Sequence, residues 1–333
     1  MEQNTIENCL RLEAKSMEEI YDTVYGNRRP IVKGMIYSGA YLFAGAPKIG
    51  KSYFMMQLAY HVSRGLPLWG CEVKKATVLY LAMEDDDRRI QQRLYQMFGT
   101  EDVSDNLFFS TRNIPLGEGL QDQIEKFIQA HKDTGLIILD TLQKVRGMES
   151  DRLSYAKDYD TVSKLKEIAD KSNICIMMVH HTRKQQSDDS FEMISGTNGL
   201  MGAADCSMIL YKERRTSNKA ILDITGRDQM DQKIYLVRDE KTMLWQFQKS
   251  ENELWKEEPD PILDAISKFV LSHGGEWDGT PTELAVGVAI DMQPNALSMM
   301  LTVRAGKLLD EYGIQFEKGR NHNGRYIKLK VKK

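Results

Sequence analysis

The sequence of 333 residues is poor in cysteine, and its few thiols form no metal or redox motif. Cys9, Cys71, Cys175 and Cys206 are far apart and include no C-x-x-C pair. Zinc sites and dithiol redox centres need closely spaced cysteines, so the sequence predicts neither. Cys175 and Cys206 fall inside apolar stretches, where we expect free thiols that are buried.

Long apolar segments are also missing. No stretch approaches the roughly 18–20 uncharged residues of a membrane helix. The polar start at residues 1–5 lacks the basic and apolar parts of a signal peptide. We therefore expect a cytoplasmic protein with no membrane partner. Hydrophobic residues make up 41% and charged residues 28%, as in globular proteins, and the length favours two domains.

Net charge is small, at −3, but it is unevenly distributed. From residue 300 onward nine Lys and Arg residues stand against three acids, so this part carries +6 and the remainder −9. A basic segment on an acidic chain indicates an anionic partner for that segment, such as nucleic acid.

One octapeptide, at residues 45–52, fits the phosphate-binding pattern G-x-x-x-x-G-K-[ST] at every fixed position. An apolar run at 41–44 predicts a strand before it, and residues 53–60 predict a helix after it. Glycines allow the backbone N–H groups to approach phosphate, and the helix adds its positive end. We expect Lys51 to bind the β- and γ-phosphates of ATP and Ser52 to ligate Mg²⁺. The nucleotide-binding residues are Gly45, Ala46, Pro47, Lys48, Ile49, Gly50, Lys51, Ser52 and Tyr53.

Two acidic positions follow later apolar runs. Asp140 ends the run 136–139, and in a P-loop NTPase an acid there lies beside the loop serine and holds the metal. Glu84 follows the run 77–82, where a carboxylate can deprotonate the water that attacks the γ-phosphate. The alternative for Glu84 is that it belongs with its acidic neighbours to a helix N-terminus.

Apolar runs alternate with amphipathic segments from about residue 38 to 248. This alternation predicts an α/β fold with a mostly parallel sheet that helices cover on both faces. Four further strands follow without long helices, at 206–211, 220–225, 234–237 and 244–247, and predict antiparallel ribbons at the end of the sheet. We expect a helical arm at 1–33, with helical spacing over 5–25, an ATPase domain at 34–250, a linker at 251–260 and a small domain at 261–333.

The pattern resembles RecA-like P-loop ATPases, and among them the RepA-type hexameric replicative helicases of plasmids, phages and other mobile elements. The resemblance covers about residues 34–248. It rests on the loop, on Leu81-Ala82-Met83-Glu84-Asp85, on Ile137-Ile138-Leu139-Asp140-Thr141, on Val179-His180-His181-Thr182, and on Ser195-Gly196-Thr197 before Ala203-Ala204-Asp205. It implies that Glu84 is the catalytic base, that Asp140 is the metal carboxylate, and that His180 or His181 senses the γ-phosphate.

The His pair and one arginine complete the expected catalytic set. Adjacent residues of a strand point to opposite faces, so His180 and His181 do not share one metal ion. A neutral imidazole at a strand end can instead donate to phosphate, and a buried structural histidine is the alternative. Arg227 closes a later strand and is our candidate arginine finger for a neighbouring subunit, with Arg214 and Arg215 as substitutes. A surface ion pair is the alternative for Arg227.

Two loops are expected at the same sheet edge as the phosphate loop, and the resemblance implies that they line a central channel. They carry Lys144 and Arg146, and Arg183 and Lys184. These cations could follow the backbone of single-stranded DNA without sequence preference. Plain solvated loops are the alternative.

Residues 261–333 predict a winged-helix domain, which is an α+β fold. The pattern contains an amphipathic helix at 261–271, a helix near 281 with Thr280 or Thr282 as cap, a helix in recognition position at 293–304, and a hairpin at 316–329 with a basic turn. We expect Lys318, Arg320 and Arg325 to contact phosphates of duplex or forked DNA, and Arg304 to lie nearer the groove. A docking module for replication proteins is the alternative.

The sequence therefore predicts an ATP- and Mg²⁺-dependent motor on single-stranded DNA, assembled as a homo-oligomer, most simply a hexamer. Two other functions remain open. One is a filament-forming recombination or repair ATPase, which handles strands without unwinding them. The other is a nucleotide-gated initiator or loader, which binds one duplex sequence and turns over ATP slowly.

Overall fold

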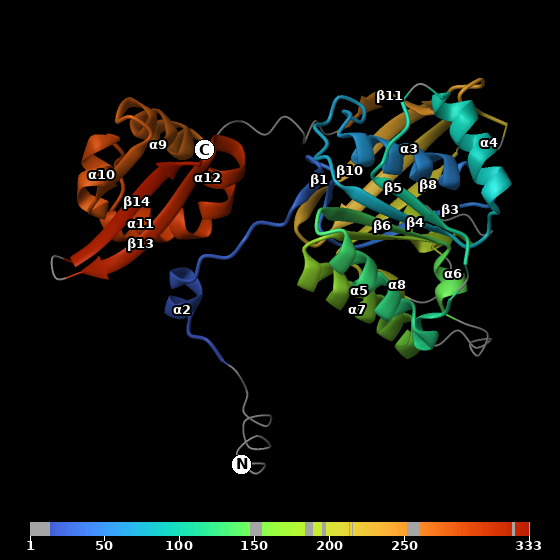
Figure 1. Cartoon of the computed structure of the whole chain (residues 1–333), viewed down its shortest axis with the longest axis horizontal. Helices are drawn as coiled ribbons and strands as arrows, with labels where there is room; N and C mark the ends of the chain where they lie inside the picture. Colours follow the sequence, from blue (N-terminus) through green and yellow to red (C-terminus); the bar gives the residue numbers. More distant parts are fainter. Residues whose placement is uncertain are drawn as a thin grey trace, which may run out of the picture. The chain divides into compact units, whose positions relative to one another are not determined.

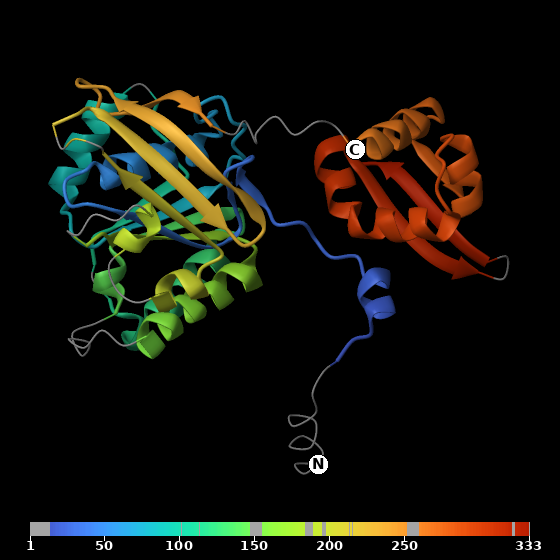
Figure 2. The same cartoon turned by 180° about the vertical axis from the view of Figure 1, so that it is seen from behind.

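The chain folds into two compact units, which we call the larger unit (residues 28–257) and the smaller unit (residues 1–27 with 258–333). The computed structural model describes residues 14–100, 102–112, 114–146, 155–183, 189–194, 198–212, 214, 216–251, 260–321 and 324–332. The larger unit has two hydrophobic cores and the smaller unit has one of its own. Figures 1 and 2 show the elements of both units.

The larger unit is built on one sheet of nine strands with the order β11-β10-β9-β8-β3-β7-β6-β4-β5. Six neighbouring strands, from β8 to β5, run parallel, whereas β9, β10 and β11 are antiparallel. The strands are β3 Gly39–Gly45, β4 Thr77–Ala82, β5 Leu107–Ser110, β6 Thr134–Asp140, β7 Cys175–His181, β8 Cys206–Tyr211, β9 Lys219–Gly226, β10 Gln229–Arg238 and β11 Trp245–Ser250. A separate pair, β1 Pro30–Val32 and β2 Ile36–Tyr37, precedes the sheet.

Helices cover both faces of this sheet, and in Figure 1 they form a layer on either side of it. One layer contains α3 Lys51–Arg64 and α4 Asp87–Phe98, whereas the other contains α5 Leu120–Ala130, α7 Tyr155–Ser172 and α8 Asn198–Ala203. The short helices are η1 Leu116–Glu118, α6 Leu142–Val145 and η2 Ser190–Met193.

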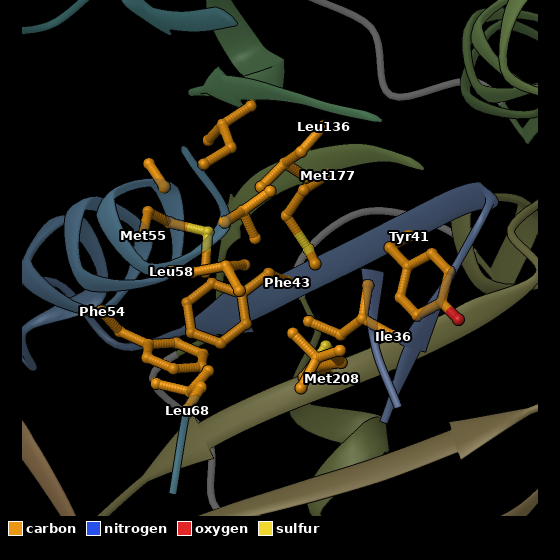
Figure 3. Close-up of a cluster of buried hydrophobic side chains, with 14 of the residues drawn as sticks. Ile36, Tyr41, Phe43, Phe54, Met55, Leu58, Leu68, Leu136, Met177 and Met208 are labelled. Atoms are coloured by element: carbon orange, nitrogen blue, oxygen red, sulfur yellow. The ribbon is translucent and has the colours of Figure 1, made fainter. Parts of the chain in front are cut away.

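The central strand β3 is buried along its whole length because its side chains alternate between two cores. Tyr41 and Phe43 face the first core, where Phe54, Met55 and Leu58 of α3 pack against the sheet (Figure 3). Leu42 faces the second core on the opposite side. Burial on both faces is the reason that the parallel strands are continuous apolar runs in the sequence.

These elements confirm the predicted α/β fold with a mostly parallel sheet and antiparallel strands at its end. Each of the predicted strands at 41–44, 77–82, 136–139, 206–211, 220–225, 234–237 and 244–247 lies within or overlaps an observed strand. The structure adds β1 and β2, which the sequence analysis did not identify.

The smaller unit contains four helices and three strands in its C-terminal part, with the sheet order β12-β14-β13. They are α9 Pro261–Ser272, β12 Glu276–Gly279, α10 Pro281–Gly287, α11 Pro294–Val303, α12 Ala305–Tyr312, β13 Ile314–Asn321 and β14 Gly324–Val331. Thr280 caps α10 through a capping box with Glu283, one of the two caps that the sequence suggested. The sequence analysis missed β12 and α12.

The N-terminal helix is shorter than the helical spacing over residues 5–25 suggested. In the part of the arm that the structure describes, one helix is present, α2 Met17–Asp22. A capping box between Ser16 and Glu19 fixes its start, and Thr23 is already extended. Residues 5–13 lie outside the described residues. A helix this short buries none of its own side chains, so it needs neighbours for stability.

Three cysteines, Cys71, Cys175 and Cys206, are buried free thiols, whereas Cys9 lies outside the described residues. Within the described ranges no helix has the length and apolar character required to cross a membrane.

Candidate nucleotide site

The phosphate loop joins β3 to α3 as the sequence predicts, and α3 begins at Lys51. Gly50 precedes the helix with a φ of 111°, which a residue with a side chain rarely adopts. At Gly45 an added Cβ would lie 2.8 Å from the carbonyl oxygen of Leu210 on β8. Both glycines are therefore needed for the path of the loop. Ala46, Pro47 and Lys48 are exposed, so this stretch is open to a ligand.

Lys51 is 7% exposed, and its ammonium group bends back over the loop. The Nζ atom donates to the carbonyl oxygens of Gly45 at 2.8 Å and Ala46 at 3.2 Å. Burial lowers the pKa of Lys51 to about 8, while the nearby carboxylates of Asp140 and Glu84 oppose this shift. A buried cation with no carboxylate in direct contact gains strongly from an anionic ligand.

Asp140 lies at the end of β6 beside the first turn of α3. Its Oδ2 atom accepts hydrogen bonds from Ser52 Oγ at 2.9 Å and from Tyr80 at 2.8 Å. The carboxylate is 5% exposed, and burial raises its pKa although both hydrogen bonds act in the opposite direction. A hydroxyl and a carboxylate in contact are the oxygen donors that Mg²⁺ prefers, so these residues fit the ion.

Glu84 is exposed two residues beyond the end of β4. Ala82 of β4 pairs with Asp140 of β6, so the two acids lie at the same sheet edge. Thr141 donates to Glu84 Oε1 at 3.0 Å, which orients the carboxylate. Its acidic neighbours have other contacts: Asp85 pairs with Arg89 and Arg93, and Asp86 caps α4. The helix-cap alternative therefore applies to Asp86, whereas Glu84 makes a contact with the Asp140 region.

The His pair at the end of β7 separates as the strand geometry requires. His181 Nδ1 lies 3.3 Å from Lys51 Nζ, whereas His180 is 5% exposed. Burial, and then the charge of Lys51, lower the pKa of His181. Of the two histidines, His181 is therefore the one that the structure brings to the phosphate loop.

Arg227 lies at the opposite edge of the sheet. Its backbone N–H bonds to the carbonyl of Asp205, which precedes β8, and its guanidinium donates to Gly202. The phosphate loop follows the other end of β3, which runs parallel to β8. Arg227 therefore has no access to the loop of its own chain. Arg214 is exposed and follows the C-terminal end of β8, whereas Arg215 lies outside the described residues.

The expected DNA loops begin at the same edge as the phosphate loop, after β6 and β7. Lys144 and Arg183 are exposed, whereas Lys184 lies outside the described residues. Arg146 differs from the expectation because its side chain is 11% exposed and pairs with the buried Asp158 at 3.1 Å. This buried pair anchors α6 to α7, so we remove Arg146 from the set of DNA-contacting residues.

Two cations beside the loop were not identified from the sequence. Arg238 Nη1 lies 3.0 Å from the position of a Cβ on Gly50, and Trp245 donates to the Gly50 carbonyl at 3.3 Å. Arg238 and Lys212 both lie over the Trp245 ring. Neither has a carboxylate partner among the described residues. Burial lowers the pKa of Lys212, and the charge of Arg238 lowers it further. They raise the positive potential beside the loop. No local motif marks them, because Arg238 at the end of β10 and Lys212 just after β8 are both far from the loop along the chain.

The candidate DNA contacts of the smaller unit have different surroundings. Arg304 pairs with Asp260, the N-cap of α9, so it ties α11 to α9 and does not extend freely from the helix. Lys318 pairs with Asp22, and Arg325 donates to Asn295. Arg320 is exposed.

Comparison with known proteins agrees with this geometry. The family model of an AAA domain, AAA_25, matches residues 8–187, which is more than half of the chain and includes the loop, Glu84, Asp140 and the His pair. The chain belongs to this AAA domain family. None of the curated proteins searched matches it. Family membership and the loop geometry both support nucleotide binding at this site.

Two solved structures resemble the fold of this AAA-family chain. One, described as an ATPase domain, has a TM-score of 0.55 at 14% identity, and the match covers 71% of this chain and 100% of that one. The other, a DnaB-like replicative helicase solved in a study of its interactions with primase, has a TM-score of 0.54 at 14% identity over 73% and 70% of the two chains. The larger unit therefore has the RecA-like fold of helicase ATPase domains.

Proposed function

We propose that the protein is an ATP-dependent motor on single-stranded DNA, most simply a hexameric replicative helicase of the RepA type from a plasmid, phage or other mobile element. The observation that carries the proposal is the meeting of Lys51, Ser52, Asp140 and Glu84 at one sheet edge. A binding protein needs the cation and the loop, whereas hydrolysis also needs the exposed carboxylate that Thr141 orients.

Each residue has a defined part in hydrolysis. Lys51 would exchange its carbonyl acceptors for phosphate oxygens, and Ser52 and Asp140 would hold Mg²⁺, which would supply positive charge to the phosphates. Glu84 accepts a proton from the water that attacks the γ-phosphate. His181, in contact with Lys51, is the candidate that reports the γ-phosphate to the loop after β7, which begins at Thr182.

The position of Arg227 supports the proposed assembly. Because it lies at the edge opposite to its own loop, it can stabilise transition-state charge only on a nucleotide of another subunit. A ring of identical subunits supplies such a contact to every site. Mixing an Arg227→Ala chain with a Lys51→Ala chain tests this: restored hydrolysis in the mixture supports a shared site, and inactive mixtures contradict it.

The smaller unit is proposed to be a winged helix that contacts duplex or forked DNA. In support of this, helices precede the β13–β14 hairpin along the chain, and the hairpin carries Lys318, Arg320 and Arg325. Docking of a replication protein is the second candidate for this unit.

Strand displacement on a forked DNA substrate tests the helicase directly. We expect the wild-type chain to displace the strand with ATP and Mg²⁺ and the Lys51→Ala variant to be inactive. Hydrolysis that depends on DNA but displaces no strand would favour the recombination ATPase. Tight binding of one duplex sequence with slow turnover would favour the initiator.

A further inference from the structure

The hairpin of the smaller unit carries its cations on two different faces. Paired residues of β13 and β14 share a face, and the face changes at every residue. Phe316 and Leu329 pair and are buried in the core. Two and four residues further along β13, Lys318 and Arg320 lie on that same side, and Arg320 pairs with Arg325. We call Lys318, Arg320 and Arg325 the inner cations.

On the outer face of the sheet, lysines form ion pairs with a glutamate of the same sheet. The inner cations form no ion pair with a carboxylate in the described part of the sheet. Lys328 and Lys330 both pair with Glu276 of β12, at 3.5 and 3.1 Å. Arg325 donates a hydrogen bond to the neutral Asn295. Arg320 lies directly opposite Arg325 on the neighbouring strand and carries the same charge. Like charges opposite each other destabilise a sheet unless an anion lies between them. Among the described residues, the one carboxylate that forms an ion pair with the inner cations is Asp22.

Asp22 comes from α2, at the other end of the chain. Its Oδ1 atom lies 2.9 Å from Lys318 Nζ, and α2 also packs on α11. The hydrogen bond and charge of Lys318 lower the pKa of Asp22, and the charge of Arg325 acts in the same direction. The helix is acidic, with Glu18 and Glu19 in its first turn and no basic residue in its last turn.

A second contact attaches the same N-terminal segment to the C-terminal part of the smaller unit. Asn27 packs directly on Gly306 of α12, where an added Cβ would lie 2.6 Å from the Asn27 side chain. Gly306 lies in the helix α12, where alanine would ordinarily be more stable than glycine. The segment from Ser16 to Asn27 is therefore held by the Asp22–Lys318 ion pair, by the packing of α2 on α11 and by the close contact of Asn27 with Gly306.

We propose that the inner cations form a binding surface for nucleic-acid phosphates and that the segment 16–27 is its resting occupant. Phosphate oxygens displace Asp22 from Lys318, so DNA binding by the smaller unit releases the N-terminal segment. The exchange is feasible because the Asp22 and Lys318 side chains are 53% and 22% exposed, and exposed ion pairs are weak. This inference rests on the proposed function of the smaller unit as a DNA-binding domain.

Duplex affinity of the full chain, measured by fluorescence anisotropy at low salt, tests the exchange. Asp22→Asn removes the competing charge, and Gly306→Ala loosens the segment without any change of charge. We expect each to tighten binding about 3- to 10-fold, since exposed ion pairs and single packing contacts have modest effects. Glu18→Gln is the matched control, because it makes the same charge change at an exposed residue with no ion pair among the described residues.

Hydrogen exchange gives a readout that does not depend on affinity. The amides of Ile20 and Thr23 bond within the segment, to Ser16 and Ile20. We expect duplex DNA to increase their exchange. Unchanged protection with DNA bound, or equal effects of Asp22→Asn and Glu18→Gln on affinity, would overturn the proposal.

A further variant separates this inference from the proposed function. The triple substitution Lys318→Gln, Arg320→Gln and Arg325→Gln removes the surface itself. If it weakens duplex binding while Asp22→Asn and Gly306→Ala have no effect, the DNA site stands and the resting occupant is wrong. If it leaves duplex binding unchanged, the DNA-binding function of the smaller unit is wrong.

Discussion

The two units hold their functional charges in different ways. In the larger unit Lys51 at the start of α3 and Asp140 at the end of β6 are 7% and 5% exposed. Asp140 accepts a hydrogen bond from Ser52, the residue after Lys51. In the smaller unit the cations lie on the surface of a hairpin and pair with residues far away in the sequence. Buried charges act strongly and in one geometry, whereas surface charges are screened and exchangeable. We therefore expect substitutions in the larger unit to abolish chemistry and those in the smaller unit to tune binding.

The largest effect expected is that of Glu84→Gln on hydrolysis. Loss of the general base should lower kcat by about 10²- to 10⁴-fold while nucleotide binding remains. Steady-state phosphate release and nucleotide titration measure the two quantities. Asp86→Asn is the control, because Asn caps a helix as well as Asp does, and it should leave kcat unchanged. Equal losses in the two variants would contradict the role of Glu84.

Leu301→Ala tests whether the smaller unit has its own core. Leu301 is fully buried there, and its truncation should cost about 2–5 kcal/mol of the stability of this unit. We expect a lower thermal midpoint for the smaller unit in calorimetry and unchanged nucleotide binding by the larger unit. The exposed Val303→Ala serves as a control with little effect. A loss of nucleotide binding in Leu301→Ala would show that the units are not independent.

Arg238→Met tests the cations beside the phosphate loop, which have no carboxylate partner in the described part of the chain. Removal of this charge should weaken ATP binding by roughly 10-fold, which corresponds to about 1.4 kcal/mol. The fluorescence of Trp245, which contacts Gly50, is a suitable signal for the titration. Lys249→Met is the control, because Lys249 lies over Tyr235 on the same strand pair. Equal affinities for wild type and Arg238→Met would place the cation outside the nucleotide site.

The smallest effect expected is that of Arg320→Gln alone. Loss of one phosphate contact should lower the slope of log affinity against log salt by about 1 for duplex DNA. Hydrolysis by the larger unit should not change. The control is Lys330→Gln, since Lys330 is already paired with Glu276. If Lys330→Gln changes the slope as much as Arg320→Gln does, the two faces of the hairpin do not differ in DNA binding.

The sequence predicted those parts of the molecule that local pattern determines. The loop at 45–52, the strands and the acids after them follow from buried parallel strands, whose ends meet at one edge by topology alone. The capping box at Thr280 is likewise local. Such features need only a few neighbouring residues, so one sequence is sufficient to find them.

The remaining features depend on contacts between residues that are distant in sequence. Arg146 pairs with Asp158 and Arg304 with Asp260, so basic residues that suggested DNA contacts instead hold helices together. Trp245 of β11 contacts Gly50 before α3, and Asp22 contacts Lys318 from the opposite end of the chain. Charge patterns and hydrophobic periodicity do not predict these contacts, because the contacts form between distant residues only when the chain has folded.

Stimulation of ATP hydrolysis by single-stranded DNA tests the central claim most directly. We expect single-stranded DNA to increase turnover of the wild-type chain strongly, and the Lys51→Ala and Glu84→Gln variants to show no increase. Turnover that is the same with and without single-stranded DNA would contradict a motor on DNA and favour the nucleotide-gated binding protein.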